Sequence, residues 1–467
     1  MIRPTTPSQR GGPVTRRSVL LIPAAGIISL GAAHASKDVE ATYARPVAVN
    51  SPIMRFDQFP IALTDRVPIN SNVTNQQSIV RVPGDWIYAV FWGADMNPYV
   101  AKIKDGDSTW QVFNLGTLPG NPLMAPAPAD EHNNLAIMLD GAGYIHISGN
   151  HHRVPLNYIR STVPNEITGW ENPGMVGSDE TEVTYPRFVQ TLDGNLLFFY
   201  RAGTSSDGDL MLNRYSTTTK TWTRVGMILK GHDWSGPGTE DMSAYPSRIV
   251  YDESTGRVHM WWTWRDTIDL ESSHDLCYLY SEDKGVTWLD GTGTAVAVPV
   301  TPGNAAVKVL TGGAGIVVTG ACVDTAANAY ATVRFPAPDG EVRLYKKTGS
   351  TFSYTVIGAG LIWHAAVFGT PDGNVYAVYA EADIAYIRQV APTLEARVQL
   401  IPWAMPHWTP STATMLNGSY AMRLLIAPCR QKAVSNYGGV LTMTVNPGTL
   451  AALSSGKLVL PEPTPVA

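Results

Sequence analysis

The run that decides the fold is Asp193-Gly194-Asn195-Leu196-Leu197-Phe198-Phe199-Tyr200, a turn signal followed by a short apolar and aromatic segment. Asp-Gly favours a hairpin turn because Gly accepts positive φ, and aromatic residues favour strands. The same unit occurs six more times, with turns at Gly84, Gly143, Gly256, Asn328, Gly373 and Gly418. The segments that follow these turns are residues 86–90, 144–147, 258–262, 330–333, 375–379 and 420–425.

The intervals between these units are each long enough for a four-stranded sheet, which needs about 40 to 50 residues in repeat proteins. Radial repetition of such sheets is how a β-propeller protects its strand edges. We therefore predict an all-β fold, a seven-bladed β-propeller formed by residues 76–460 as a single domain. Residues 36–75 show no clear period and contain four prolines, so we predict an extended lead-in there.

A second local pattern agrees with this fold. Residues 281–288, Ser-Glu-Asp-Lys-Gly-Val-Thr-Trp, fit the Asp-box hairpin Ser-x-Asp-x-Gly-x-x-Trp, and residues 105–110 are a degenerate copy. In this hairpin the carboxylate binds backbone N–H groups of the turn, and the Trp packs between sheets. The pattern indicates propeller blades and carries no information about chemistry.

The composition indicates a turn-rich, extracellular β-protein. Charged residues make up 16% of the 467, against about 25% in an average soluble protein, while there are 42 Gly, 34 Pro, 13 Trp and 20 Tyr. After residue 33 no run approaches the roughly 18 apolar residues of a membrane helix. We predict a monomer that does not associate with membranes once its signal is removed.

The N-terminus predicts export to the periplasm or the extracellular space. Residues 15–21, Thr-Arg-Arg-Ser-Val-Leu-Leu, resemble a twin-arginine motif, an apolar stretch follows, and Ala33-His34-Ala35 is a small-x-small cleavage site. We therefore expect residues 1–35 to be a signal peptide. An uncleaved anchor is the alternative.

The mature chain is expected to be acidic. Residues 1–35 hold four arginines and no acid, so their removal takes the formal charge from −5 to about −9. Such a protein has no general attraction for nucleic acid, and an anionic ligand must be held by local positive charge. The three cysteines, Cys277, Cys322 and Cys429, allow at most one disulfide.

Candidate functional residues concentrate between residues 130 and 201. Four of the ten histidines lie within residues 130–152. His132 is in a polar run, so we expect a functional role and not a core position. His151 and His152 follow a strand end, where one of two neighbours faces away, and spacing does not say which.

Tyr185 and Arg201 can each be interpreted as a structural or as a functional residue. Tyr185 precedes Pro186, which keeps it out of helical geometry, and by itself such a Tyr is usually a packing residue. Arg201 ends an apolar strand, so it is either half of a structural ion pair or a carboxylate clamp.

The motifs together resemble a known family, the BNR-repeat polysaccharide lyases typified by ulvan lyases. The resemblance rests on residues 130–133 (Asp-Glu-His-Asn), 143–146 (Gly-Tyr-Ile-His), 151–152 (His-His), 184–186 (Thr-Tyr-Pro), 200–203 (Tyr-Arg-Ala-Gly) and 264–265 (Trp-Arg). It implies a seven-bladed propeller and β-elimination at a uronic acid of a sulfated, rhamnose-containing glycan, an anionic polysaccharide.

By motif position, the resemblance implies that Arg201 neutralises the uronate and that His132 and Tyr185 transfer protons. His151, His152 and Tyr245 would line the sugar site. These residue types suit the reaction, because the C5 proton becomes acidic only when the carboxylate charge is neutralised, and a base and an acid must then act. Which of His132 and Tyr185 is the base is left open, and no cofactor is required.

A second cluster, His259, Cys277 and His364, is a candidate for a structural zinc site. Family members can carry a structural metal nearby, and two imidazoles with a thiolate suit zinc. The alternative is that Cys277 and His259 are core residues.

Other functions on the same fold are a glycoside hydrolase, either rhamnosidase-like on rhamnose-glucuronate or a sialidase, and a non-catalytic glycan-binding propeller. No Arg-Ile-Pro motif near the start of the predicted propeller supports the sialidase. The presence of both His132 and Tyr185 favours the lyase over the binding protein.

Overall fold

The computed structural model describes residues 77–399, except 94, 105–106, 108–109, 127–130, 239, 337–339, 360–364 and 382–383, together with five strand segments outside that range. These segments are residues 54–58, 411–412, 414–415, 422–426 and 441–445. The chain divides into two compact units, Met1–Thr42 and Tyr43–Ala467, and every described residue belongs to the second.

The described residues are all-β, with strands and five short 3-10 helices and no α-helix among them. The 3-10 helices are η1 (Leu115–Thr117), η2 (Pro122–Met124), η3 (Glu131–Asn133), η4 (Leu270–Ser272) and η5 (Ala305–Val307). In this part of the chain no helix is long and apolar enough to cross a bilayer.

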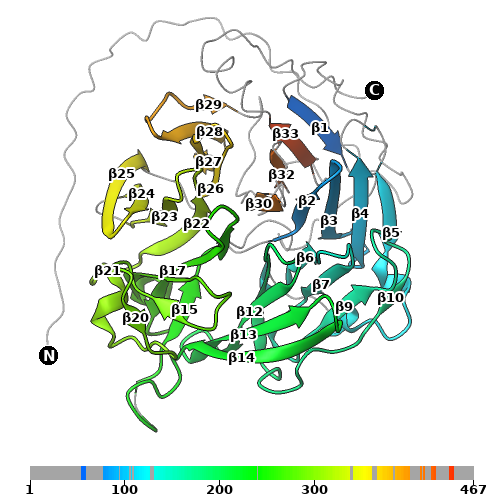
Figure 1. The fold of residues 1–467 in the computed structure, drawn as a ribbon, viewed down its shortest axis with the longest axis horizontal. Coiled ribbons are helices and arrows are strands. Elements are labelled where there is room, and N and C mark those ends of the chain that lie inside the picture. The colour runs from blue at the N-terminus through cyan, green and yellow to red at the C-terminus, as the bar shows by residue number, and fades with distance from the viewer. Residues whose placement is uncertain are drawn as a thin grey trace, which may run out of the picture. The chain divides into compact units, whose positions relative to one another are not determined.

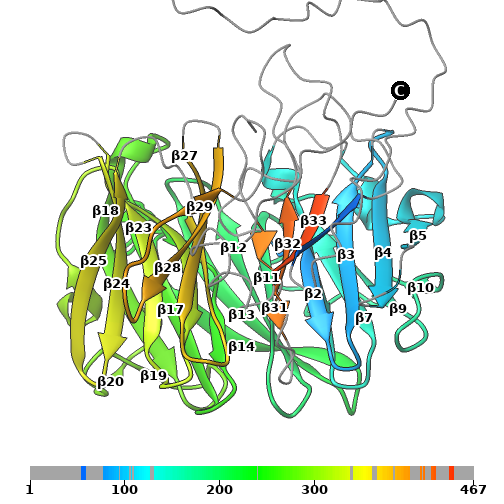
Figure 2. The same cartoon turned by 90° about the horizontal axis from the view of Figure 1, so that it is seen from above.

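Two sheets contain strands from both ends of the chain (Figures 1 and 2). One has the order β1-β33-β32-β30, and the other has the order β31-β2-β3-β4-β5. Their strands are β1 (Met54–Gln58), β33 (Leu441–Val445), β32 (Met422–Ile426), β30 (Ser411–Thr412), β31 (Thr414–Met415), β2 (Ile79–Val82), β3 (Trp86–Trp92), β4 (Pro98–Lys104) and β5 (Gln111–Asn114). Residues 54–58, expected in the extended lead-in, thus form a strand that pairs with β33.

Three further sheets are four-stranded and antiparallel. Their strands are β6 (Leu135–Leu139), β7 (Ile145–Gly149), β9 (Tyr158–Ser161) and β10 (Trp170–Glu171); β22 (Val317–Val323), β23 (Ala329–Arg334), β24 (Glu341–Thr348) and β25 (Thr351–Ala359); and β26 (Ala365–Gly369), β27 (Val375–Glu381), β28 (Ile384–Ala391) and β29 (Val398–Gln399).

The twelve-stranded sheet consists of two antiparallel groups. The first group is β8 (His152–Val154), β11 (Val183–Gln190), β12 (Leu196–Gly203), β13 (Gly208–Ser216) and β14 (Thr221–Leu229). The second is β15 (Ser243–Pro246), β16 (Val250–Asp252), β17 (Arg257–Arg265), β18 (Ser273–Ser281), β19 (Trp288–Leu289), β20 (Ala295–Val296) and β21 (Lys308–Leu310). A single parallel contact, Gly208 with Ser243, joins the groups.

All seven turn-and-strand units of the sequence are observed as strands. They are β3, β7, β12, β17, β23, β27 and β32, and each lies inside its sheet with a partner on both sides. An inner strand packs on both faces, which explains the unbroken apolar runs. In β12, Leu196 and Phe198 contact one hydrophobic cluster, while Leu197 and Phe199 contact another.

The Asp-box prediction at residues 281–288 is confirmed in detail. Asp283 accepts hydrogen bonds from the backbone N–H groups of Val286 and Thr287, and Gly285 adopts φ 88°. Trp288 is buried and donates from its indole N–H to the Gly285 carbonyl. Most of the degenerate copy at residues 105–110 lies outside the described residues, but Trp110 is buried.

Candidate functional site

The site is organised around an irregularity in β11. Thr184 pairs with Arg201, but the next pair is Arg187 with Phe199, so Tyr185 and Pro186 together oppose the single residue Tyr200. Such a β-bulge changes the direction in which a side chain points, and β-bulges are frequent beside active sites. Tyr185 adopts φ 59°, a strained value for a non-glycine residue that costs on the order of 1 to 3 kcal/mol.

Arg201 is buried beside this bulge, with 3% of its surface exposed. Its Nη2 donates to Thr184 Oγ1 at 3.2 Å and its Nη1 to Tyr245 Oη at 3.1 Å. The guanidinium carbon lies 5.0 Å from the centre of the Tyr185 ring. Its Nε has no hydrogen-bond partner. The predicted pair of Arg201 and Tyr185 is therefore brought together.

Tyr245 on β15 is shared by two guanidinium groups. Its hydroxyl accepts hydrogen bonds from Arg201 and from Nη2 of Arg265, and donates to the Ser205 carbonyl at 2.9 Å. Arg265 lies over the Tyr245 ring, 3.8 Å from its centre. Burial, with a smaller contribution from Tyr185, raises the pKa of Tyr245 to about 12. The charges of Arg201 and Arg265 lower this pKa, but their effect is smaller than that of burial. Tyr245 is thus a fixed, neutral anchor for both cations.

Arg187 supplies a third cation next to Tyr185. It is buried, its Nη1 donates to the Tyr185 carbonyl at 3.3 Å, and its Nη2 donates to the Pro246 carbonyl at 3.0 Å. Burial, with a smaller contribution from the charge of Arg201, lowers the pKa of Arg187 to about 9. Arg187 therefore remains protonated at neutral pH.

His132 and His152 complete the cluster. Their rings stack, with centres 4.2 Å apart and an angle of 19° between the planes. The His132 ring centre is 5.6 Å from that of Tyr185, and His152 pairs with Thr184 through β8. The structure thus brings together the side chains of five candidate residues, His132, His152, Tyr185, Arg201 and Tyr245.

His151, expected in the sugar site, lies elsewhere. It is fully buried, and its Nε2 accepts a hydrogen bond from the Asn157 backbone N–H at 2.6 Å. Burial lowers the pKa of His151 to about 3, so the ring is neutral in the fold. Its neighbour His152 faces His132 instead, which resolves the choice that sequence spacing left open.

Arg187 and Arg265 received no role from the sequence. Arg187 is the second residue after Tyr185, while Arg265 ends an apolar strand as Arg201 does and belongs to the Trp-Arg motif of the family resemblance. No carboxylate of a described residue pairs with Arg187, Arg201 or Arg265. Three guanidinium groups without a counter-ion create a local positive potential that can bind an anionic ligand.

The predicted zinc ligands do not share a site in the described structure. His259 pairs with Tyr280, and Cys277 pairs with Trp262. An odd number of positions separates these two pairs, so the side chains of His259 and Cys277 point to opposite faces of the sheet. His259 bonds to the Tyr278 hydroxyl at 2.6 Å, and Cys277 is a buried free thiol. His364 lies outside the described residues.

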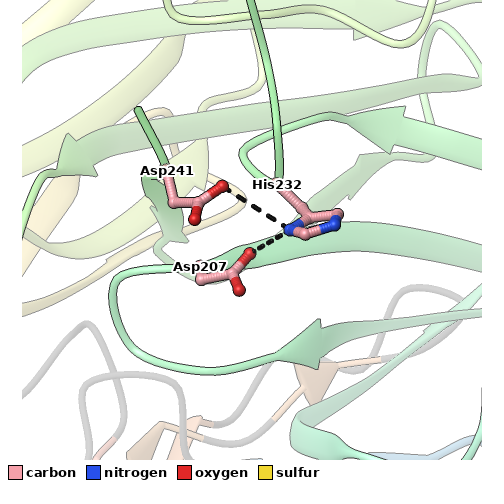
Figure 3. Close-up of side chains that lie close together, drawn as sticks. All are labelled: Asp207, His232 and Asp241. Atoms are coloured by element: carbon pink, nitrogen blue, oxygen red, sulfur yellow. Dashed lines mark hydrogen bonds and ion pairs between the residues drawn. The ribbon is translucent and has the colours of Figure 1, made fainter. Parts of the chain in front are cut away.

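Figure 3 shows another group of metal-ligand types, Asp207, His232 and Asp241. His232 Nδ1 lies 2.6 Å from an Asp207 oxygen and 3.5 Å from an Asp241 oxygen. The hydrogen bond with Asp207 and the nearby carboxylates raise the pKa of His232. The hydrogen bond between His232 and Asp207 accounts for the arrangement without a metal ion. The group holds the loop whose Ser205 carbonyl contacts Tyr245.

Two sequence relatives are ulvan lyases. The ulvan lyase of Alteromonas sp. (strain LOR) is 22% identical over 247 residues, which cover 46% of this chain and 48% of that protein. The long isoform of the ulvan lyase of Glaciecola sp. (strain KUL10) is 40% identical over 47 residues, or 10% of this chain and 5% of that protein. The match thus spans at most about half the length of these relatives.

Two solved structures share the fold. Polysaccharide lyase Uly1 has a TM-score of 0.62 at 13% identity, covering 79% of this chain and 90% of that chain. A PL25 ulvan lyase bound to -[GlcA(1-4)Rha3S]- has a TM-score of 0.59 at 14% identity, covering 85% and 99%. The sequence model of the BNR repeat-containing family matches residues 86–357, more than half of the chain. The protein therefore belongs to the BNR repeat-containing family and is similar to ulvan lyases.

Proposed function

We propose that the protein is a polysaccharide lyase that cleaves a uronate-containing glycan by β-elimination. The observation that carries the proposal is the buried guanidinium of Arg201, which has no carboxylate partner among the described residues and lies against Tyr185. A uronate carboxylate supplies the missing negative charge and binds an Arg through two hydrogen bonds. His132 and Tyr185, whose ring centres are 5.6 Å apart, are then the proton-transfer groups.

The reaction follows from these groups. Arg201 neutralises the uronate carboxylate, with Arg265 and Arg187 adding positive potential, and this stabilises the charge that develops when the C5 proton leaves. A base takes that proton, the electron pair forms the C4–C5 double bond, and the C4–O4 bond breaks. An acid protonates the departing O4. His132 and Tyr185 supply the base and the acid.

The substrate we propose is an ulvan-type glycan of sulfated rhamnose and uronate. Both curated relatives are named ulvan lyases, and one structural neighbour holds a glucuronate–sulfated rhamnose unit. A polyanion of this kind suits three guanidiniums that have no carboxylate partner among the described residues, on an otherwise acidic protein. We also propose export through the N-terminal segment, since a polymer substrate is outside the cell.

We further propose that the sheets form a seven-bladed β-propeller. The described strands form seven groups when the twelve-stranded sheet is divided at the parallel contact between β13 and β15, and all pairs within the groups are antiparallel except β2 with β31. Contacts run from one group to the next through β2, β6, β11, β16, β22, β26 and β30, and β2 also contacts β32. These contacts support a closed succession of seven sheets.

The proposed activity is tested by incubating the purified protein with ulvan and other polyuronates. Elimination creates an unsaturated uronate that absorbs in the ultraviolet. New reducing ends without this absorbance would indicate a glycoside hydrolase instead. Binding with neither product would indicate a glycan-binding protein and would overturn the proposed enzyme.

The roles of His132 and Tyr185 are tested by His132→Ala, Tyr185→Phe and the double variant. Each single change should lower kcat by at least about 10²-fold, and the double variant should be little worse, because groups that act as a unit are not additive. The limb of the pH–rate profile lost in each variant identifies the base and the acid. Near-normal elimination by either variant would remove that residue from the mechanism.

A further inference from the structure

We propose that Arg187 is a positioning residue of this site: it fixes the bulge that presents Tyr185 and joins it to the strand that carries Tyr245. The inference rests on the proposed function, because it assigns Tyr185 to the reaction. Packing alone does not explain why the charged side chain of Arg187 is buried. Arg187 is 3% exposed, and no carboxylate of a described residue pairs with it.

The hydrogen bonds of Arg187 show what it holds. One arm of the guanidinium donates to the carbonyl of Tyr185, the strained residue of the bulge. The other arm donates to the carbonyl of Pro246, the residue after Tyr245 on β15. A planar fork with fixed donor directions is suited to binding two separate carbonyl groups at a set spacing. Arg187 thus ties the two Tyr-Pro segments together.

The Tyr185 ring is enclosed by this arrangement. The guanidinium carbons of Arg187 and Arg201 lie 5.7 and 5.0 Å from the centre of the ring, and the Tyr245 ring meets it edge-on at 6.0 Å. A cation near the face of an aromatic ring is attracted to it. The Tyr185 side chain therefore has one well-defined direction, toward the ring of His132.

The cost of this arrangement argues for a role in the site. A buried charge without a counter-ion is unfavourable, and replacing such groups with apolar residues is often neutral or stabilising. The backbone strain at Tyr185 adds to that cost. Backbone strain and a buried charge without a counter-ion are typical of residues retained for function, because such residues lower stability but are required for activity.

The test compares Arg187→Met, which keeps the length of the side chain without donors or charge, with Arg187→Lys, which keeps donors and charge. Arg187→Met should lower kcat by about 10- to 100-fold, the scale of a small misplacement of a reacting group. KM should change little, and the melting temperature should be unchanged or higher. Arg187→Lys should recover part of the lost kcat.

Arg160→Met is the matched control. Arg160 is also buried, but it pairs with Glu171 at 2.6 Å and donates to the Tyr215 hydroxyl, so it is a structural cation outside the site. Its replacement should lower the melting temperature and leave kcat unchanged. If Arg187→Met behaves like this control, Arg187 is structural and the inference is overturned.

Two outcomes separate this inference from the proposed function. A wild-type protein that forms no unsaturated product from any polyuronate overturns the proposed function, and the role of Arg187 falls with it. An active wild type with an equally active Arg187→Met variant overturns only the role of Arg187. A crystal structure of Arg187→Met adds a readout that is independent of activity. Tyr185 should leave its left-handed conformation, and an unchanged bulge would overturn the inference.

Discussion

At the scale of single residues, the buried arginines that have no carboxylate partner among the described residues are more informative than the histidines that cluster in the sequence. Of the four histidines within residues 130–152, the structure brings only His132 and His152 into the site. His146 and His151 are fully buried and bond to Tyr158 and Asn157. The four histidines therefore cluster in the sequence for two reasons: two belong to the candidate site, and two pack in the interior.

Arg201→Met is the sharpest residue-scale prediction. Turnover should fall by at least about 10²-fold, as expected for one electrostatic group that faces a developing charge. The melting temperature should be unchanged or higher, because no carboxylate of a described residue loses its partner. Initial rates and thermal denaturation measure the two effects separately.

Arg214→Met is the control for this prediction. Arg214 lies on β13, and its guanidinium donates to the carbonyls of Asp283 and Lys284 in the Asp box. This variant should keep wild-type turnover. An Arg201→Met protein that unfolds would favour the structural reading of Arg201.

At the scale of elements, local turn chemistry sets where strands begin, and one bulge sets where the site is. Gly194 adopts φ 77°, and its Cα lies so near Gly141 that a Cβ built on Gly141 would be 2.4 Å from it. A side chain at either glycine would force two turns apart. The bulge at Tyr185 depends on pairing with a separate strand, so its position was not encoded in the turn pattern.

Asp283→Ala tests the stabilising role of the Asp box. The carboxylate accepts hydrogen bonds from the N–H groups of Val286 and Thr287 and from the Thr287 hydroxyl, at 3.1, 2.8 and 2.6 Å. Their loss should lower the free energy of unfolding by about 1 to 3 kcal/mol. Asp283→Asn keeps one acceptor oxygen and should lose less. Denaturant titrations compare the variants, and equal stability of all three proteins would contradict the assignment.

At the scale of the whole molecule, strands from both ends of the chain meet in two sheets. β1 pairs with β33 along five residues, and β2 pairs with β31. Removing residues 1–59 should therefore lower the free energy of unfolding by roughly 2 to 5 kcal/mol, given the modest net value of each backbone hydrogen bond. Removal of residues 1–45 is the control and should have little effect. Equal melting of the two truncated proteins would refute a stabilising role of the β1–β33 pairing.

The buried histidines predict how stability depends on pH. Burial lowers the pKa of His151 to about 3 and that of His259 to about 4. Below the unfolded pKa of about 6.5, the unfolded chain binds protons that the folded chain does not. The free energy of unfolding should therefore fall as the pH drops from about 6.5 toward 4, by roughly 1 kcal/mol per pH unit for each histidine.

Denaturant titrations at several pH values test this, with His151→Gln as the variant. It keeps an acceptor for the Asn157 N–H and should weaken the pH dependence. His232→Gln is the control of opposite sign, because carboxylates raise the pKa of His232. The stability that His232 contributes is present below the unfolded pKa and is lost as the pH rises through the folded pKa. An unchanged pH slope in His151→Gln would refute the prediction.

The sequence by itself determined the all-β class, the seven turn-and-strand units and the Asp box, and it predicted a functional role for His132. These features were readable because turn chemistry and apolar runs act between residues close in the chain. The family resemblance added Tyr185 and Arg201 as candidates and predicted the roles of all three residues, but not their geometry.

Only the tertiary structure decided which way side chains face. His152 enters the site while His151 is buried, and His259 and Cys277 lie on opposite faces of one strand pair. It also brought Arg187 and Arg265 to the two tyrosines. The physical reason is that side-chain direction alternates along a strand, and a single bulge reverses it, so register against distant strands fixes the site.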